Sequence, residues 1–385
     1  YALAVVLVSQ KHYVEAETVL RQAIQLDREW SQPHALLSQV LTALGRAPEG
    51  LQHLQTIVQE LPEQADLRFA YARLLVANSA YAEALEQFRS LYQQQSEDSD
   101  VIYAYAMLAT QQKAWDEASP LWRQLQKASR FEAEATYFLA QVEEAQGNLE
   151  QAISDYLDVD EGPLRVDAVI RASSLLADTG GLAQAQEYLT QARVAHADRG
   201  QDLYLAETQV LQRTGQPSEQ ILAVYQVAID QHPQSNDLLY NRGLYYSELQ
   251  EFELMEADFQ AVIARQPDHA ESLNALGYVL ADRGVRLQQA LEYIQRAHQL
   301  RPDNPALLDS LGWVHYRLGD LERALKYLEA AMKTQLDDEI AAHYGEVLWV
   351  SGRTEEAREV WSEAFKLAPE SPFLRAVFER FSVSP

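Results

Sequence analysis

The chain has 385 residues, 47% of them hydrophobic and 23% charged, with 15 Gly, 13 Pro and no Cys. This composition excludes collagen-like, disulfide-rich and disordered proteins. The 57 acidic and 31 basic residues give a formal net charge of −26, which would repel a phosphate backbone, so nucleic acid is not an expected partner. Without cysteine, the chain offers no thiol nucleophile, disulfide or thiolate metal ligand.

The apolar opening, residues 1–8, is far shorter than the about 20 residues that a membrane-spanning helix needs, so no membrane span is predicted. The sequence does not begin with Met. Leu3, Ala4 and Leu7 occupy places inside a repeat whose first residues are missing. We therefore expect a longer protein, with any targeting segment upstream of this chain.

Two apolar positions recur along the whole chain in steps of 33 to 36 residues. The second position is large: Leu20, Leu54, Phe88, Trp122, Tyr156, Leu189, Tyr225, Phe259, Ile294, Leu328 and Trp361. Four residues before it stand Ala16, Gly50, Ala84, Ala118, Ala152, Ala185, Ile221, Met255, Ala290, Ala324 and Ala357. A third, small position lies twelve residues earlier still in many units, as at Ala72, Ala106 and Gly312. Such a period predicts pairs of amphipathic helices, A and B, in which small residues allow close approach.

Turn residues mark the ends of both predicted helices. Gly45, Gly147, Gly215, Gly319 and Gly352 stand where helix A gives way to helix B, where a left-handed cap is expected. Prolines follow the large position by eight residues at Pro62, Pro233, Pro267, Pro302 and Pro369, and they are expected to end helix B.

The pattern resembles the tetratricopeptide repeat family, and the resemblance spans essentially the whole chain. The best units are Leu308, Leu311, Gly312, Ala324, Leu328, Ala331, and Ala357, Trp361, Ala364, Pro369. The resemblance implies an all-α solenoid, a right-handed superhelix of about eleven helix-turn-helix repeats plus a C-terminal capping helix.

The expected organisation has four parts: repeats 1 to 5 over residues 1–160, irregular repeats 6 and 7 over 161–235, repeats 8 to 11 over 236–369, and a capping helix and tail over 370–385. The irregular part contains Gly162, Gly180, Gly181 and a 36-residue step, which fits either a hinge or an irregular turn pair. The capping helix begins at Ser371 and Pro372. Its expected apolar face is Phe373, Leu374, Val377, Phe378 and Phe381.

Catalytic motifs are missing from the sequence: it has no phosphate-binding glycine loop, nucleophile elbow or helix-borne zinc motif. No catalytic, cofactor or metal site is therefore predicted, and the chain is not expected to be an enzyme. His315 and His343 fall near the concave side, where we interpret them as ordinary polar lining.

In this family, helix A positions 2, 5, 9 and 12 line a concave groove. Position 5 is aromatic at Phe69, Tyr103, Tyr137 and Tyr240, and the late repeats add Tyr278, Trp313, Tyr316 and Trp349. Tyr and Trp suit a peptide-binding wall, but the same rings could instead pack between adjacent helices, and the sequence leaves both open. Asn241 and Asn274 could hydrogen-bond an extended backbone. Asp237, Glu271, Asp309 and Glu339 stand where a carboxylate clamp would need basic residues.

Three late segments bear a closer resemblance: residues 274–278 (NALGY), 309–313 (DSLGW) and 345–349 (GEVLW). They resemble a bacterial family of outer-membrane lipoproteins that act as adaptors for a carboxyl-terminal processing protease. That resemblance implies a non-catalytic scaffold that docks the protease and delivers cell-wall crosslink hydrolases to it. It also implies the periplasmic face of the outer membrane, with membrane attachment only through an upstream lipid anchor; a cytoplasmic location is the alternative.

Two other classes of function stay open at this point. One is an assembly scaffold for envelope or secretion machinery, with no protease partner. The other is a substrate-binding arm for an enzyme domain that lies upstream.

Overall fold

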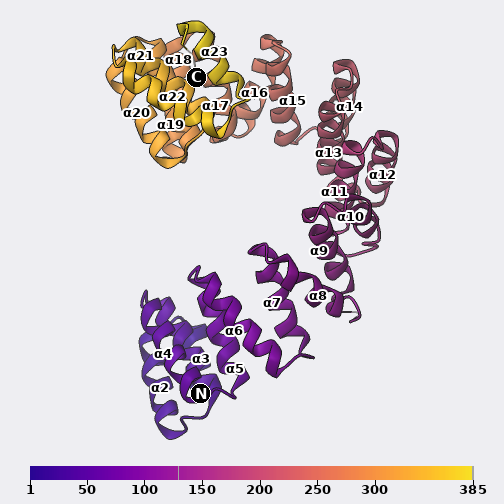
Figure 1. The fold of residues 1–385 in the computed structure, drawn as a ribbon, viewed down its shortest axis with the longest axis vertical. Coiled ribbons are helices and arrows are strands. Elements are labelled where there is room, and N and C mark those ends of the chain that lie inside the picture. Colours follow the sequence, from indigo (N-terminus) through magenta and orange to yellow (C-terminus); the bar gives the residue numbers. More distant parts are fainter. Residues whose placement is uncertain (129, 384–385) are drawn as a thin grey trace. The chain divides into compact units, whose positions relative to one another are not determined.

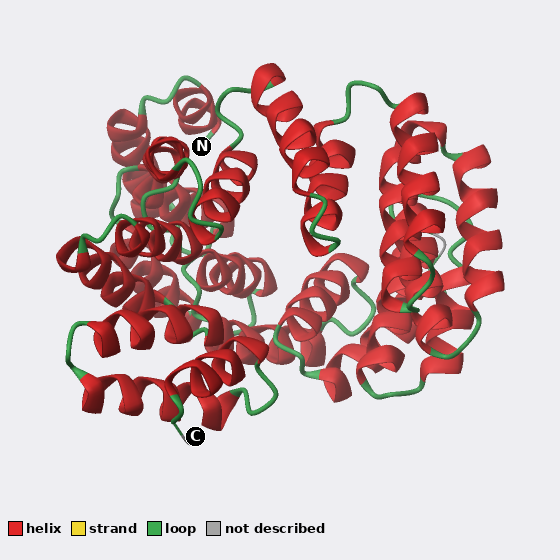
Figure 2. Cartoon of the chain, turned by 90° about the horizontal axis from the view of Figure 1, so that it is seen from above, coloured by secondary structure: helices red, strands yellow, loops and turns green. Residues whose placement is uncertain are grey.

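The computed structural model describes residues 1–128 and 130–383, and everything that follows concerns these residues. They form 23 α-helices, one short 3-10 helix and no strand (Figures 1 and 2). The predicted all-α solenoid of eleven helix pairs and one closing helix is confirmed. No helix in these ranges is both long and apolar enough to cross a bilayer.

Packing divides the helices into two units, residues 1–199 and 200–385. In unit 1 the A helices are α1 (Ala2–Ser9), α3 (Ser31–Ala43), α5 (Ala65–Ala77), α7 (Ser99–Gln111), α9 (Glu132–Ala145) and α11 (Arg165–Asp178). Its B helices are α2 (Tyr13–Leu26), α4 (Ala47–Glu60), α6 (Tyr81–Gln94), α8 (Trp115–Leu125), α10 (Leu149–Leu157) and α12 (Leu182–Ala195), followed by the 3-10 helix η1 (Ala197–Arg199).

Unit 2 repeats the same alternation of helices and ends on an unpaired one. Its A helices are α13 (Gly200–Arg213), α15 (Asn236–Glu248), α17 (Ala270–Asp282), α19 (Pro305–Arg317) and α21 (Asp338–Val350). Its B helices are α14 (Ser218–Gln231), α16 (Phe252–Arg265), α18 (Leu287–Leu300), α20 (Leu321–Thr334) and α22 (Thr354–Leu367), and α23 (Pro372–Phe381) closes the unit.

The division between the units falls inside the irregular segment 161–235. There α10 is short and the connection to α11 is long, whereas α13 and the turn after it are each one residue longer than in the regular pairs of unit 1. These small length changes account for the uneven repeat steps around this segment.

Each of the eleven A-to-B turns contains a residue with positive φ. The five predicted glycines are confirmed, with φ between 66° at Gly215 and 85° at Gly352. Gly180 and Gly284 do the same, and the remaining turns use Lys11, Ser79, Lys113 and Gln250. The turn therefore requires the left-handed conformation even where the sequence supplies no glycine. At the other end, each predicted proline stands two residues beyond its B helix, as at Pro62 after α4.

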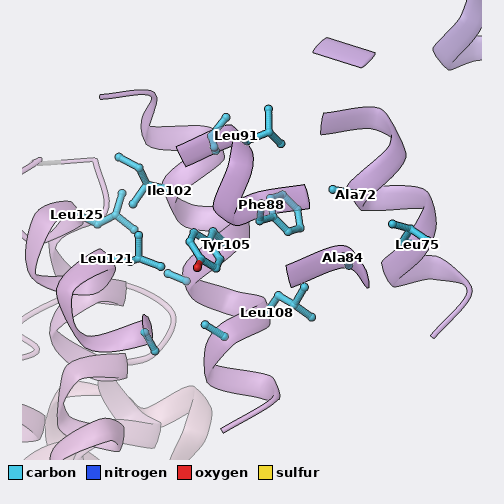
Figure 3. Packing of buried hydrophobic residues seen from close by; sticks show 14 of the residues in the cluster. Ala72, Leu75, Ala84, Phe88, Leu91, Ile102, Tyr105, Leu108, Leu121 and Leu125 are labelled. Atoms are coloured by element: carbon cyan, nitrogen blue, oxygen red, sulfur yellow. The ribbon is translucent and has the colours of Figure 1, made fainter. Parts of the chain in front are cut away.

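Within each pair, the small residue of helix A faces the large residue of helix B. At Gly277, an added methyl group would lie 2.6 Å from Ile294 Cγ1, and at Gly243 it would lie 2.7 Å from Phe259 Cε1. Unit 1 has alanine at this position in most pairs, as at Ala72, which is fully buried, and serine at Ser38 and Ser173. The large residue also meets the next repeat, because Phe88 of α6 stacks on Tyr105 of α7 at 6.3 Å (Figure 3).

The closing helix α23 begins as predicted, because the Ser371 hydroxyl accepts a hydrogen bond from the Leu374 backbone N–H at 3.2 Å. Leu374, Val377 and Phe378 are buried, and Phe381 stacks on Trp361 at 5.7 Å. The prediction for Phe373 was wrong: its ring is exposed. Phe373 stands four residues before Val377 and thus on the same side of α23, but in the first turn of the helix its ring is left uncovered.

Candidate functional site

A cavity of about 570 Å³ opens between α3 and α5, two neighbouring A helices of unit 1. We call it the α3–α5 groove. It is lined by Ala35, Ser38, Gln39, Thr42, Asp66, Phe69, Ala70, Arg73, Leu74 and Ala77. These residues recur at intervals of three and four along both helices, so each helix presents one face to the cavity.

The space in the α3–α5 groove comes from the small side chains of Ala35, Ala70 and Ala77. Phe69 supplies the apolar wall, and its ring meets Phe88 of the same repeat edge-on at 6.0 Å. The groove is therefore apolar at its base, held in place by core packing behind Phe69.

Polar side chains at the mouth of the groove differ in whether they already have a hydrogen-bond or ion-pair partner. The hydroxyls of Ser38 and Thr42 donate to carbonyls of their own helix at 2.8 and 2.9 Å. Arg73 is exposed and lies 6.0 Å above the Phe69 ring, and no carboxylate of the described chain pairs with it. The groove thus offers a free guanidinium and the exposed amide of Gln39 beside an apolar surface.

The other position-5 aromatics occupy the equivalent place in their own repeats but are engaged more deeply. Tyr103 meets Trp122 edge-on at 5.6 Å, Tyr137 meets Tyr156 at 5.4 Å, and Tyr240 meets Phe259 at 5.7 Å. Each ring thus packs on the large residue of its own B helix and is only partly exposed. The rings therefore pack between helices, as one of the two interpretations expected, and peptide binding by their exposed part stays a prediction.

In unit 2 the corresponding surface, which we call the unit 2 wall, consists of α17, α19 and α21. Here aromatic residues bond to carboxylates of the chain itself. The Tyr278 hydroxyl donates to Glu339 at 2.7 Å, Tyr316 donates to Glu346 at 3.1 Å, and Trp313 Nε1 donates to Asp282 at 3.3 Å.

The aromatic side chains of the unit 2 wall are also buried or partly buried. Trp313 is buried, and burial next to Glu346 raises the pKa of Tyr316 to about 12. Trp349 packs on Trp361 at 5.8 Å and on Phe381 at 5.6 Å, so it joins the last repeat to the closing helix. The polar atoms of Tyr278, Trp313 and Tyr316, which a partner could have used, are thus already hydrogen-bonded within the chain.

Asn241 and Asn274, which were predicted to contact a peptide backbone, differ in whether their side chains are already hydrogen-bonded. The Asn241 side-chain N–H donates to the Asp237 carbonyl of its own helix at 2.8 Å. The Asn274 carbonyl oxygen is buried and has no hydrogen-bond partner in the described chain. Asn274 is thus a polar group of the unit 2 wall with unused hydrogen-bonding capacity.

His315 and His343 are buried, so their interpretation as polar lining was wrong. His343 stacks on Trp313 at 4.1 Å, and its Nδ1 lies 3.0 Å from both Asp309 carboxylate oxygens. Burial alone would lower the pKa of His343, but the Asp309 carboxylate outweighs it and raises the pKa. His315 stacks on Tyr327 at 5.7 Å, and burial lowers its pKa. The pattern of polar and apolar residues along these helices did not indicate that the two histidines are buried.

A second cavity, of about 550 Å³, lies against α2 and α4 in unit 1 and has His34 and His53 in its lining. His34 Nδ1 lies 3.0 Å from His53 Nε2, and His34 Nε2 lies 2.9 Å from the Arg28 carbonyl. Because the carbonyl can only accept, His34 donates to it and accepts from His53. Burial lowers the pKa of both rings, that of His53 to about 4.

In the described parts of the chain, no three or more His, Asp or Glu side chains come together in a way that could hold a metal ion. The described cavities and side chains therefore support contacts with a peptide or protein surface, by apolar packing and hydrogen bonds.

Known proteins share this architecture. Two family profiles described as tetratricopeptide repeat match the chain, one over residues 286–344 and one over 35–99, 103–165 and 240–305. A TPR repeat-containing protein of Pseudomonas aeruginosa is 39% identical over 208 residues, which are 54% of this chain and 35% of that protein. A TPR repeat-containing protein of Methanocaldococcus jannaschii is 31% identical over 94 residues, 24% of this chain and 16% of that protein. The chain thus spans about a third or less of the length of these relatives.

Among solved structures, yeast Tom70 aligns with a TM-score of 0.49 and 14% identity, over 99% of this chain and 95% of that chain. A chain of the APC/C hetero-tetramer Cut9–Hcn1 aligns with a TM-score of 0.47 and 12% identity, over 98% of this chain and 94% of that chain.

Proposed function

Because the chain belongs to the tetratricopeptide repeat family, whose fold is typically a non-catalytic scaffold for protein partners, we propose that it is an adaptor for proteolysis. In this proposal it docks a carboxyl-terminal processing protease and delivers protein substrates, chiefly cell-wall crosslink hydrolases. It acts on the periplasmic face of the outer membrane, attached through a lipid anchor on the longer protein. The late-repeat segments 274–278, 309–313 and 345–349 support this choice of partner through their resemblance to such adaptors.

The observation that carries the binding role is the α3–α5 groove, which combines an open apolar base with a free cation. An extended client segment can place an apolar side chain over Ala35 and Ala70 while its polar groups reach Gln39 and Arg73. The aromatic wall loses little rotamer entropy on binding, because Phe69 is already held by Phe88.

The proposed mechanism is concentration of the client near the protease rather than chemistry. One surface of the array holds the protease and another holds the client, so the second encounter becomes intramolecular. The gain in rate is set by the geometry of the two surfaces. A scaffold with a single binding surface would give no such gain.

The test uses the purified chain, the carboxyl-terminal processing protease of the same organism and a cell-wall hydrolase as client. Binding is followed by biolayer interferometry, and degradation by gel electrophoresis. We expect the wild-type chain to bind both proteins and to accelerate cleavage of the client. A chain that binds neither protein contradicts the proposal.

The groove assignment is tested with the double variant Gln39→Ala/Arg73→Gln, because both side chains are exposed and neither supports the core. Client affinity should fall by about tenfold or more, since a hydrogen bond to a charged group contributes roughly 1.5–3 kcal/mol. Arg283→Gln is the matched control, because Arg283 also lies over an aromatic ring, Phe252 at 3.9 Å, but outside the groove. Equal client affinity for the double variant and the wild type would move the client to another surface.

A further inference from the structure

The α3–α5 groove carries two opposite charges on one face of α5. Asp66 and Arg73 both line the groove, and both side chains are exposed. They stand seven residues apart, which is about 10.5 Å along the helix axis. Neither forms an ion pair or a side-chain hydrogen bond within the described chain. The groove therefore has a free anion towards one end and a free cation towards the other, with Ala70 between them.

The acidic residue at this position of helix A is paired in other repeats. Its partner there is an arginine just after helix B of the same pair: Asp100 with Arg130 at 3.1 Å, Asp167 with Arg199 at 2.8 Å, and Glu271 with Arg301 at 2.6 Å. Asp66 lacks such a partner, because Ser96 stands one repeat before Arg130, in the place of the arginine. The serine thus leaves the Asp66 carboxylate available to a bound molecule.

The cation is likewise specific to α5 among the regular A helices of unit 1. The residues that take the place of Arg73 are Gln39 in α3, Met107 in α7 and Gln141 in α9, and none of them is charged. Neighbouring repeats therefore do not reproduce the combination of a free acid and a free base. The two charges together distinguish the α3–α5 groove from the equivalent surfaces of those repeats.

The distance between the two charges suits an extended peptide segment. In a strand, alternate side chains point to the same side, and residues i and i+4 lie about 13 Å apart. This exceeds the separation of Asp66 and Arg73 along α5 by about 3 Å, which flexible side chains such as lysine can span. The side chain at i+2 then lies over Ala35 and Ala70, at the apolar base of the groove.

From these observations we infer that the α3–α5 groove selects client segments with the pattern basic–x–apolar–x–acidic, where x is any residue. The basic side chain pairs with Asp66, the apolar one fills the base, and the acidic one pairs with Arg73. The basic residue also offsets the repulsion between an acidic segment and a chain of formal charge −26. This inference rests on the proposed client-binding role of the groove and adds the chemistry of the bound segment.

The test measures binding of synthetic peptides to the purified chain by fluorescence anisotropy at low salt. One peptide is centred on Lys-Ser-Leu-Ser-Glu and a second on the reverse order, and matched peptides have Gln in place of Lys, of Glu or of both. We expect one of the two orders to bind, and each replacement by Gln to weaken it by about two- to fivefold, as for exposed ion pairs. Equal affinity of the peptides with and without the two charges overturns the inference.

Variants of the chain assign each charge to its partner. Asp66→Asn should weaken binding of peptides that contain Lys but not of those with Gln in its place, and Arg73→Gln should do the same for Glu. Ser96→Arg should act like Asp66→Asn, because it supplies the arginine that pairs with the equivalent carboxylate in other repeats. An affinity of Asp66→Asn for the Lys peptide that equals the wild-type value also overturns the inference.

Asp237→Asn is the matched control for Asp66→Asn. Asp237 is exposed, holds the same repeat position in the first turn of α15 and lies outside the groove. Both changes remove a carboxylate from the positive end of a helix, so they should cost similar helix stability. Asp237→Asn should nevertheless leave the affinity for every peptide unchanged.

The segment pattern and the adaptor role can fail separately. If the chain binds the cell-wall hydrolase and accelerates its cleavage while none of the peptides binds, the segment pattern is wrong and the adaptor role stands. If the peptides bind with the expected dependence on charge but the carboxyl-terminal processing protease does not bind, the adaptor role is wrong and the segment pattern stands.

Discussion

The α3–α5 groove of unit 1 and the unit 2 wall are built from the same repeat positions, yet they have opposite chemical character. In the groove, small residues leave about 570 Å³ of space and Arg73 has no carboxylate partner in the described chain. In the wall, Tyr278, Trp313 and Tyr316 donate to Glu339, Asp282 and Glu346 of the chain itself. The comparison shows that the same repeat positions keep polar groups free for a partner in one unit and satisfy them within the chain in the other.

The largest expected effect concerns the core behind these two surfaces. Trp122 in unit 1 and Trp361 in unit 2 are the large residues of their repeats, and both are fully buried. Replacing either by Ala should lower the free energy of unfolding by roughly 3–5 kcal/mol through the cavity that remains. Urea unfolding measures this loss, and hydrogen exchange shows where protection falls.

Because a repeat contacts only its neighbours, Trp122→Ala should reduce protection in unit 1 and Trp361→Ala in unit 2. An equal loss of protection in both units after either change would show that the two units unfold as one, contrary to this comparison.

A smaller effect should distinguish how closely the helices approach in the two units. At Gly277 an added methyl group would lie 2.6 Å from Ile294 Cγ1 and 3.0 Å from the Ala290 carbonyl oxygen. Gly277→Ala should therefore cost about 1–3 kcal/mol by overpacking, although Ala is the better helix former.

The reverse change in unit 1, Ala106→Gly, should cost only about 1 kcal/mol, because it removes one methyl group and loosens the helix. Thermal unfolding of both variants checks the comparison. If Gly277→Ala raised the melting temperature, the close approach of α17 and α18 would be excluded.

The smallest expected effect is an opposite response to pH of two local pairs, His34–His53 in unit 1 and His343–Asp309 in unit 2. Burial holds the pKa of His53 at about 4, so the stability from the His34–His53 pair is complete above the unfolded value of about 6.5 and is lost as the pH falls. Asp309 raises the pKa of His343, so that pair stabilises unit 2 below about 6.5 and loses its contribution as the pH rises through the raised pKa.

Hydrogen exchange, corrected for intrinsic rates, should therefore show the first repeats of unit 1 weakening in acid and the last repeats of unit 2 weakening in mild alkali. His53→Gln should reduce the acid response, because only His34 then keeps a lowered pKa, and His343→Gln should remove the alkaline response. The same pH response around both pairs would contradict the assigned protonation states.

Local sequence signals were sufficient for the helices and their ends. The recurring Ala and large apolar residues predicted all eleven pairs, and the predicted glycines and prolines mark the turns and helix ends in the structure. These signals act within a few residues. Glycine favours positive φ, proline lacks a backbone N–H donor, and small residues allow one helix to approach the next closely. The four turns that use Lys11, Ser79, Lys113 or Gln250 were missed, because the repeat imposes the conformation against local preference.

The sequence was less informative about which side chains are free. It left open whether Tyr103 and Tyr137 line the groove or pack between helices, and the structure shows that each supports its own repeat through Trp122 or Tyr156. It gave no sign that Arg73 lacks a partner while Glu339 has one. The place of a residue in the repeat specifies on which side of its helix the side chain lies. Its hydrogen-bond and ion-pair partners come from neighbouring repeats, about 34 residues away.

The sequence by itself therefore determined the family, the number of helix pairs, the turns and the closing helix, because these depend on spacing and on local backbone preference. Only the tertiary structure decided that His343 is buried against Asp309 and that the α3–α5 groove is open. The physical reason is that burial and pairing depend on residues far apart in the chain, which close packing brings together.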